Sequence, residues 1–465
     1  MDAIDNSAGV DCSDHEVNIK ILLDAIVEAG DMTEKQRNEL LASMTDEVGN
    51  LVLRDNYQQT QAIDQALALA YPMVDVHARY IHSLEQTGRL DRNLEFLPGD
   101  EELGERRSDN RGLTAPEIAI LLSYSKITTY QDLLDSDAPE DAYLSRELER
   151  YFPTPLRERF REQIHEHRLH RQITATHVTN SLVNRCGPSF VFRLGEETGA
   201  EAPDIARAYM AAREIFSLRS LWDDVEGLDN MVEAGIQTKI MLDARKLVER
   251  ATRWLLRYRR TPLDIRGTIS HFSEGANELA ESIPAILVDG DRESVENAAG
   301  RLIEAGVPKG LADRAAALGP MFPALDITDV ANANGEPLDT AAAVYFTLGD
   351  RLKLHWLRRH IEALPRDNRW RTLARSALRD DIFNQQAALT AEVLRNTPQD
   401  EPPGERIEAW KGINEGPVHR TMQVLADINS SGTFDLSTLS VALREIRNLI
   451  TTQEALSEEV EASAR

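Results

Sequence analysis

The sequence predicts a mainly α-helical protein. Three observations support this: apolar residues recur at three- and four-residue steps along most of the chain, helix start and stop residues flank these stretches, and apolar-polar alternation is nearly absent. A chain of 465 residues is long enough for roughly two to four domains with a sizeable core.

The first helix is expected to begin at Ser13. Ser13–Glu16 has the pattern of a capping box, in which the Ser hydroxyl accepts an early backbone N–H and Glu16 reaches back. Apolar residues from Val17 onward then mark one face, and Gly30 is expected to end the helix. The next helix is predicted to start at Thr33 and to carry an apolar stripe over Leu40–Val52, until Gln58 and Gln59 interrupt it.

Further helices follow the same pattern. Tyr71–Thr87 is amphipathic and ends at Gly88, and Thr114–Glu117 places a Pro and an acid in a first helical turn. Ser189–Leu194 is the best candidate for a strand, although its alternation is weak. Domain or segment boundaries are expected at four breaks in this rhythm: 97–104, 151–155, 260–262 and 396–404.

Composition excludes several classes of function. Lys and Arg number 52 against 78 Asp and Glu, a formal net charge of -26, which disfavours binding to nucleic acid or to an anionic membrane. No apolar stretch approaches the roughly 20 residues of a membrane span. Cys12 and Cys186 lie far apart and match no zinc-binding or redox motif, which is typical of a reducing cytosol where thiols stay free. A cytoplasmic protein without nucleic-acid or membrane partners is expected.

Three local patterns are interpreted as structural. His165, His167 and His170 lack the spacing of a zinc helix, so a solvated helix face is preferred and no metal site is predicted. The basic and aromatic stretch Arg253–Arg260 could contact single-stranded nucleic acid, but pairing with acidic neighbours is the better interpretation. Cys186 is expected to be a buried thiol. No glycine-rich dinucleotide or P-loop motif occurs.

The opening stretch Asn6–Ser13 combines a carboxamide, small residues, an aliphatic side chain and a hydroxyl. Small residues allow a ligand to approach the backbone closely, and a hydroxyl at a helix N-terminus favours an anion. These parts suit a nicotinamide amide on one side and a carboxylate on the other. A simple left-handed turn before a helix cap would use the same residues, so composition alone leaves both alternatives open.

A resemblance to a known family bears on this choice. Asp2–Lys20 resembles the end of the catalytic domain of the large bacterial NAD-specific glutamate dehydrogenases, and Asn6–Val10 is more distantly similar to the Asn-Ala-Gly-Gly-Val segment of the small hexameric enzymes. Other stretches are similar to the family's C-terminal helical region: Gly30–Val48, Leu51–Thr60, Leu94–Pro98, Leu121–Ile127, Tyr151–Pro153, Glu196–Ala200 and Val441–Arg447. The resemblance covers essentially the whole chain.

The resemblance implies an oxidative deamination in which L-glutamate passes a hydride to NAD and yields 2-oxoglutarate and ammonia. It implies that Asn6 faces the nicotinamide, that Val10 lines the glutamate side chain, and that Ser13 donates a hydrogen bond to the substrate's side-chain carboxylate. At Ser7 and Ala8 the chain departs from the small enzymes, which have Ala and Gly there. The family's catalytic Lys and Asp and its Rossmann domain lie upstream of the matching region, so no catalytic residue is expected in this chain and NAD would be held mainly by upstream residues.

These inferences predict three parts: residues 1–30 as a short remnant of an α/β (Rossmann-type) catalytic domain, 31–260 as a helical region, and 261–465 as a bundle-like C-terminal helical region. The preferred hypothesis is that the chain is the C-terminal portion of an NAD-specific glutamate dehydrogenase, which forms a homo-oligomer, and that it comes from a truncated gene, a split gene or deliberate fragmentation. This chain alone is expected to be inactive, because the NAD-binding fold and the catalytic Lys and Asp lie upstream. The alternative is a freestanding helical scaffold or oligomerisation protein derived from such an enzyme.

Overall fold

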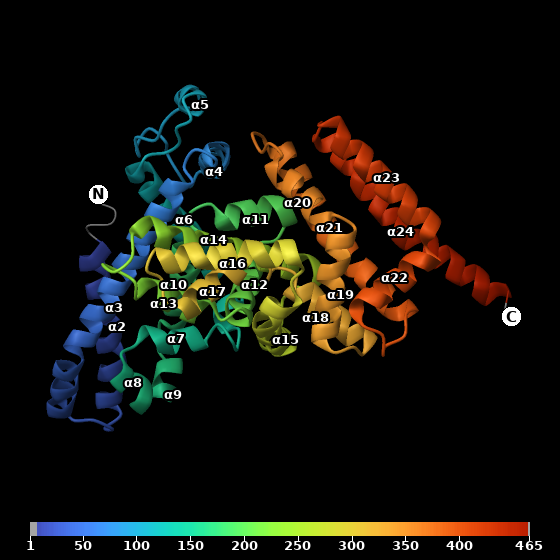
Figure 1. Ribbon diagram of the computed structural model, residues 1–465. Coiled ribbons are helices and arrows are strands. Elements are labelled where there is room, and N and C mark those ends of the chain that lie inside the picture. Colours follow the sequence, from blue (N-terminus) through green and yellow to red (C-terminus); the bar gives the residue numbers. More distant parts are fainter. Residues whose placement is uncertain (1–6, 464–465) are drawn as a thin grey trace. The chain divides into compact units, whose positions relative to one another are not determined.

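The structure is a computed structural model that describes the backbone of residues 7–463 and the side chains of residues 8–288 and 290–450. Within this described part the chain forms helices and no strand (Figure 1). The predicted mainly α fold is confirmed. The remnant of an α/β domain stays a prediction, because its described residues form a helix.

The chain divides into two compact units. Unit 1 contains the chain up to Arg213 together with Val248–Thr268, and unit 2 contains Glu214–Leu247 and the chain from Ile269 onward. These two units are divided at other residues than the parts predicted from the sequence, whose boundaries at residues 30 and 260 therefore stay a prediction.

The helices that lie in unit 1, wholly or for most of their length, have the following bounds: α2 (Ser7–Glu28), α3 (Glu34–Ala68), α4 (Val74–Gln86), α5 (Asp100–Ser108), α6 (Ala115–Leu134), η1 (Ala138–Glu140), α7 (Arg146–Tyr151), α8 (Thr154–Arg159), α9 (Arg161–His165), α10 (His170–Cys186), α11 (Phe190–Thr198) and α12 (Ala202–Ile215). Helix α3 is central to this unit, because α2, α6 and α10 all pack against it.

Unit 2 contains the following helices, wholly or for most of their length: α13 (Leu218–Glu226), α14 (Ala234–Tyr258), α15 (Ile265–Ile286), α16 (Asp289–Glu304), α17 (Lys309–Ala317), α18 (Ala324–Asn334), α19 (Leu338–Arg351), α20 (Leu354–Ala363), α21 (Arg369–Asn396), α22 (Pro403–Ile413), α23 (Glu415–Ser431) and α24 (Leu436–Ser463). Helix α21 is central here and packs against α18, α19, α20, α22 and α24.

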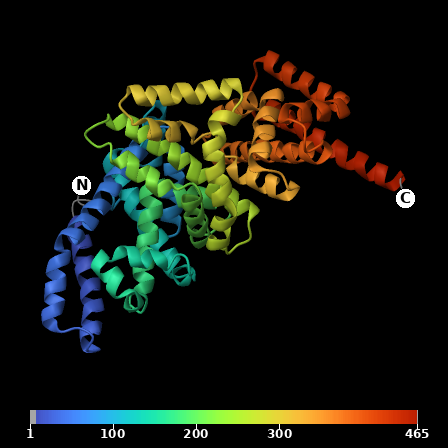
Figure 2. The ribbon, with the colours of Figure 1, turned by 60° about the horizontal axis from the view of Figure 1, so that its bottom comes forward.

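Helices α2 and α3 form an antiparallel hairpin, whose two arms lie side by side in Figures 1 and 2. The predicted stop and start are confirmed: Gly30 has a φ of +83°, a conformation that glycine adopts without strain, and the Thr33 hydroxyl caps α3 by accepting from the backbone N–H of Gln36 at 3.3 Å. The reciprocal bond, from the backbone N–H of Thr33 to the Gln36 side chain, completes a capping box.

Two boundaries predicted for this hairpin are wrong. Helix α2 begins at Ser7, so Ser13 lies in its second turn and does not cap its N-terminus. Helix α3 continues through Gln58 and Gln59 to Ala68. Both glutamines are only partly buried, and the apolar stripe resumes beyond them with the buried Ala62 and Ile63, so burial sustains the helix across the polar interruption.

A buried apolar cluster holds the hairpin against the short helices α7 to α9 and against α10. Its members are Ile19, Leu22, Leu23, Ile26, Met32, Leu40, Met44, Leu148, Tyr151, Phe152, Leu156, Phe160, Ile164 and Ile173. In α2 these residues lie at positions 19, 22, 23 and 26, the spacing of one helix face. The second half of α2 is therefore anchored in an apolar core.

Other predicted elements have mixed outcomes. Helix α6 begins after Thr114 as predicted, with the Glu117 side chain accepting from the backbone N–H of Thr114 at 2.7 Å.

The strand predicted at Ser189–Leu194 is wrong, because Phe190–Thr198 is helix α11. Its two fully buried side chains, Phe190 and Leu194, are spaced four residues apart, and a run this short does not distinguish a strand from a buried helix.

Gly112 lies against the turn that follows α3. A Cβ at this position would overlap the backbone of Ala70 and Tyr71, and no side-chain rotation relieves a clash with backbone. We expect Gly112→Ala to lower the free energy of unfolding by about 1–3 kcal/mol. Gly104→Ala, in the exposed part of α5 where a Cβ meets no atom, should instead stabilise by about 0.5–1 kcal/mol. Thermal melts of both variants check the prediction, which is contradicted if both shift in the same direction.

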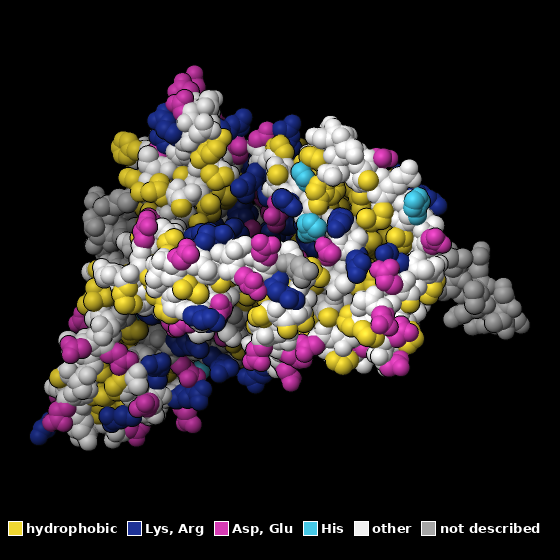
Figure 3. Space-filling model, in the orientation of Figure 1, with side chains coloured by type: hydrophobic (Ala, Val, Ile, Leu, Met, Phe, Trp, Pro, Cys, Tyr) yellow, Lys and Arg dark blue, Asp and Glu magenta, His cyan; other side chains and the backbone are white. Residues whose placement is uncertain are grey.

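No helix in the described part of the chain is both long enough and apolar enough to cross a lipid bilayer. On the face drawn in Figure 3, acidic and basic side chains are interspersed.

Candidate functional site

The first turns of α2 expose a stripe of apolar and hydroxyl side chains. Val10, Ser13 and Val17 lie three and four residues apart, which places them on one helix face. Val10 and Val17 are 58% and 51% exposed, and Ser13 between them is exposed too. The Ser13 Oγ donates to the backbone carbonyl of Val10 at 2.7 Å. Asn6, the third predicted contact residue, lies outside the described residues.

The adjacent face of α2 is braced by Tyr151 at the end of α7. The Tyr151 hydroxyl donates to Asp14 Oδ2 at 2.8 Å and accepts from Asn18 Nδ2 at 2.9 Å, and the His15 ring stacks on the Tyr151 ring with centroids 4.3 Å apart. Asn18 Nδ2 also donates to Asp14 Oδ1 at 3.1 Å. These contacts fix the rotation of α2 about its axis and hence the direction in which Ser13 points.

Three further side chains converge beside this brace. Asp11 and His15 of α2 and Asp55 of α3 each place one oxygen or nitrogen within 4.8 Å of the other two. His15 is buried, whereas Asp11 and Asp55 are half-buried. We refer to these residues as the Asp11–His15–Asp55 cluster.

Burial and mutual repulsion perturb the ionisation of this cluster. Burial raises the pKa of Asp11 to about 7, and the nearby Asp55 and Asp14 carboxylates add to the rise, while the Lys126 ammonium opposes it. Burial also lowers the pKa of His15, so its imidazole is neutral at pH 7. The pKa of Lys126 falls to about 8 because burial outweighs the attraction of Asp55 and Asp11.

The histidines singled out in the sequence do not converge. His165 Nε2 lies 2.8 Å from Glu149 Oε1, and His170 Nδ1 donates to the backbone carbonyl of His167 at 3.0 Å. His167 is buried and its Nε2 donates to the backbone carbonyl of Asn18 at 3.1 Å. The interpretation of this stretch as a solvated face is therefore wrong for His167, which is a structural contact to α2.

The basic stretch at Arg253–Arg260 begins with buried ion pairs. Arg253 is buried, its Nε donates to Glu197 Oε2 at 2.5 Å, and its Nη2 donates to Glu249 Oε1 at 3.1 Å. Arg193 pairs with Glu249 through two bonds of 2.6 Å. Pairing with acidic neighbours is confirmed for Arg253, and Cys186 is buried as predicted.

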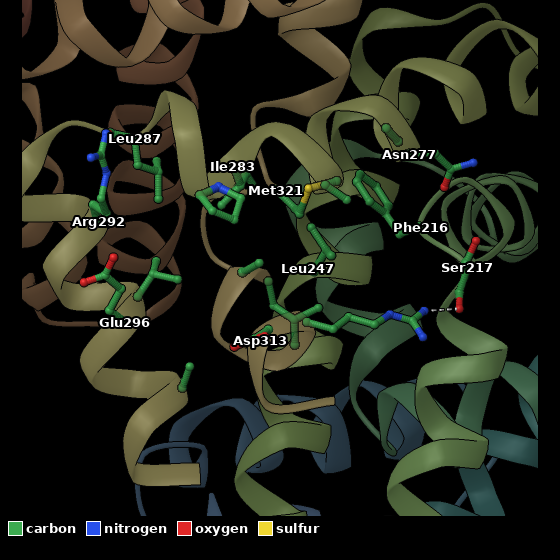
Figure 4. Close-up of a pocket in the computed structure, with 18 of the residues that line it drawn as sticks. Phe216, Ser217, Leu247, Asn277, Ile283, Leu287, Arg292, Glu296, Asp313 and Met321 are labelled. Carbon is green, nitrogen blue, oxygen red and sulfur yellow. Dashed lines mark hydrogen bonds between the residues drawn. The ribbon is translucent and has the colours of Figure 1, made fainter. Parts of the chain in front are cut away.

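Unit 2 contains a cavity of about 620 Å³ (Figure 4). Phe216, Leu247, Ile283 and Met321 contribute an apolar wall. At its edge Arg314 Nη2 donates to the backbone carbonyl of Ser217 at 2.7 Å. None of the residues that the sequence predicted as ligand contacts lines this cavity.

Sequence reasoning missed the Asp11–His15–Asp55 cluster. Asp11 and His15 lie at i and i+4 of a helix, a spacing that places two ligating side chains on one face, and this signal was available. The approach of Asp55 to them depends on the α2–α3 pairing register, which no local pattern specifies.

Two segments of the chain match known protein families. Residues 110–448 match the family described as glutamate dehydrogenase, C-terminal, and residues 1–66 match the bacterial NAD-glutamate dehydrogenase catalytic domain. The second match contains α2 and ends within α3.

Three curated relatives carry the name NAD-specific glutamate dehydrogenase. The chain is 44% identical over 448 residues to the protein from Halomonas elongata, 42% over 448 residues to that from Pseudomonas aeruginosa, and 38% over 451 residues to that from Mycobacterium tuberculosis. These alignments cover 96%, 96% and 97% of this chain but only 28% of each relative.

Proposed function

This chain belongs to the family of bacterial NAD-specific glutamate dehydrogenases, and we propose that it forms the C-terminal part of such an enzyme, including the last substrate-contacting segment of the catalytic domain. The complete enzyme would deaminate L-glutamate oxidatively to 2-oxoglutarate and ammonia. We place it in the cytoplasm as a homo-oligomer, on the family resemblance and the two free cysteines.

The observation that carries this proposal is the exposed stripe of Val10, Ser13 and Val17 within the segment that matches a catalytic domain. Exposed apolar side chains next to a hydroxyl suit the methylene groups and the carboxylate of a glutamate side chain. Ser13 Oγ donates to a main-chain carbonyl of its own helix, and rotation about χ1 would redirect the same proton to a bound carboxylate. Val10 would contact the methylene groups.

NAD would be held mainly by other parts of the enzyme. The described residues contain no strand and hence no βαβ unit, the element that binds a dinucleotide, so we derive no step through NAD from this chain. The proposed contact between Asn6 and the nicotinamide is the one role in cofactor binding that we assign here.

The chain alone is expected to show no glutamate-dependent NAD reduction above the rate of a blank, because the described residues contain no dinucleotide-binding fold. The measurement is NADH absorbance with purified chain, glutamate and NAD. Turnover at an enzyme-like rate would contradict the proposal that this chain is only part of the active site.

Ser13→Ala, introduced into a polypeptide that carries this chain together with the NAD-binding fold, should raise the KM for glutamate by about 10- to 100-fold. This range corresponds to loss of one hydrogen bond to a charged group. The KM for NAD should not change, since Ser13 is assigned to the substrate carboxylate. Cys12→Ala is the matched control, because Cys12 is an exposed neighbour outside the stripe. An unchanged KM for glutamate would remove Ser13 from the site.

A further inference from the structure

We propose that Asp11, His15 and Asp55 bind a divalent transition-metal ion, Zn²⁺ or Mn²⁺, which links α2 to α3. The oxygen and nitrogen atoms of the three side chains lie within 4.8 Å of one another. Ligand atoms around such an ion, at about 2.0–2.2 Å from it, are separated by roughly 3–4 Å, so small side-chain rotations complete the arrangement. The inference concerns the helical hairpin and does not depend on the proposed enzyme activity.

The imidazole of His15 is the feature that most favours a ligand. His15 is 2% exposed, its buried Nδ1 has no hydrogen-bond partner among the described residues, and its Nε2 lies 3.9 Å from Asp11 Oδ1, beyond hydrogen-bond distance. A buried polar group without a partner costs free energy, and the large majority of such groups in proteins have partners. A metal ion between the three side chains would accept the lone pair of the ring nitrogen that carries no proton.

The carboxylates of Asp11 and Asp55 also favour a bound metal ion, because they lack the hydrogen bonds that the neighbouring Asp14 has. Asp14 accepts hydrogen bonds from Tyr151 and Asn18, whereas the buried Asp11 Oδ2 accepts no hydrogen bond from any side chain or backbone group that the structure describes. The Asp55 carboxylate, which lies in the cluster, has no hydrogen bond or ion pair to any described residue. Two carboxylates that approach this closely repel each other unless positive charge lies between them.

Lys126 is the competing source of that positive charge. It is half-buried near both carboxylates, yet it forms no ion pair within 4.0 Å with any acid in the described part of the chain. The other groups around the cluster are His177 beside His15 and the already bonded Asp14 and Tyr151. The carboxylate pair therefore has a cation near it but not in contact.

The donor set indicates the class of ion. One imidazole nitrogen and two carboxylate oxygens suit Zn²⁺ or Mn²⁺, whereas Mg²⁺ and Ca²⁺ prefer oxygen ligands alone. Asp11 and His15 are at i and i+4 of α2, the spacing that helices use to present two ligands to one ion. The ion would also hold the first turns of α2, which lie outside the apolar cluster that anchors its second half.

The experiment uses the full chain after treatment with a chelator. We expect Zn²⁺ or Mn²⁺ to bind with a stoichiometry of one ion per chain by calorimetry and to raise the Tm by about 5 °C at saturation, while Mg²⁺ has little effect. Asp55→Asn should weaken binding by at least about tenfold, in keeping with the 10- to 100-fold cost of losing supporting groups at metal sites. It should not lower the Tm of the metal-free chain, because it removes a repulsion.

Asp46→Asn is the matched control, since Asp46 is an exposed acid of α3 and should leave binding unchanged. Lys126→Met separates the two sources of positive charge. If a metal ion balances the carboxylates, this variant binds it more tightly than the parent chain does. The proposal is overturned if neither ion binds, if Asp55→Asn and Asp46→Asn bind equally well, or if Lys126→Met binds no more tightly than the parent chain.

Discussion

Replacing Arg406 by Met should lower the free energy of unfolding of unit 2 by about 3–5 kcal/mol, the cost of removing one partner from a buried ion pair. The Arg406 side chain is fully buried and its Nη2 donates to Glu336 Oε1 at 2.8 Å and to the backbone carbonyl of Leu394 at 2.8 Å. Its Nε donates to Thr397 Oγ1 at 2.9 Å. Met fills much of the volume but leaves the Glu336 carboxylate, only 3% exposed, without this cation.

Denaturant unfolding, together with hydrogen exchange of the α22 amides, measures this effect. Arg351→Met is a suitable control because the side chains of Arg351 and of its partner Glu408 are each 52% exposed, so its change should stay within about 0.5 kcal/mol. A loss below about 1 kcal/mol for Arg406→Met would show that water or a rearranged side chain neutralises Glu336, and the argument for a dry ion pair would fail.

Phe152→Ala is expected to destabilise unit 1 by about 3–5 kcal/mol, the usual range for deleting a fully buried aromatic ring. Phe152 is 0% exposed in the apolar cluster that joins α2 and α3 to α7 through α10, and its ring meets that of Tyr151 edge to face at 5.1 Å. The cavity would also loosen Tyr151, which donates to Asp14. We therefore expect faster amide exchange in α2 as well as a lower Tm.

The same substitution at Phe96 provides the comparison. Phe96 is 90% exposed, so Phe96→Ala removes an equal number of atoms without opening a cavity, and its Tm should stay within about 1 °C of that of the parent chain. Equal effects of the two variants would mean that the cluster around Phe152 is not close-packed.

The sequence predicts those parts of the fold that depend on adjacent residues. Thr33, Gly30 and Thr114 act through bonds that span three or four residues, so their roles could be inferred without a structure. The prediction that Ser13 caps the first helix is wrong because Ser7, Ala8 and Gly9 also join the helix, and no local pattern marks these residues as helical.

The candidate site depends on contacts between distant residues. Tyr151 meets Asp14 across 137 positions, and Asp55 meets Asp11 only through the packing of α3 on α2. Their spacing in the sequence carries no signal of proximity, because the register of the hairpin is set by apolar residues such as Leu23 and Met44. The position of Val10 and Ser13 on one face could be predicted, but the exposure of that face depends on the rest of the unit.

Helix α2 is anchored in the apolar cluster only along its second half, and this has a mechanical consequence. Leu23 lies in the core and Ser13 ten residues before it, which is about 15 Å along the axis of a helix. Because the helix is held at one end, a tilt of its axis by about 4° would move Ser13 by about 1 Å. A displacement of about 1 Å can lower the rate at a catalytic site by about a hundredfold. The hydrogen bonds that join Tyr151 to Asp14 and Asn18 lie between the anchored part of α2 and Ser13. The position of Ser13, the proposed substrate contact, therefore depends on the hydroxyl of Tyr151, a residue to which we assign no contact with the substrate.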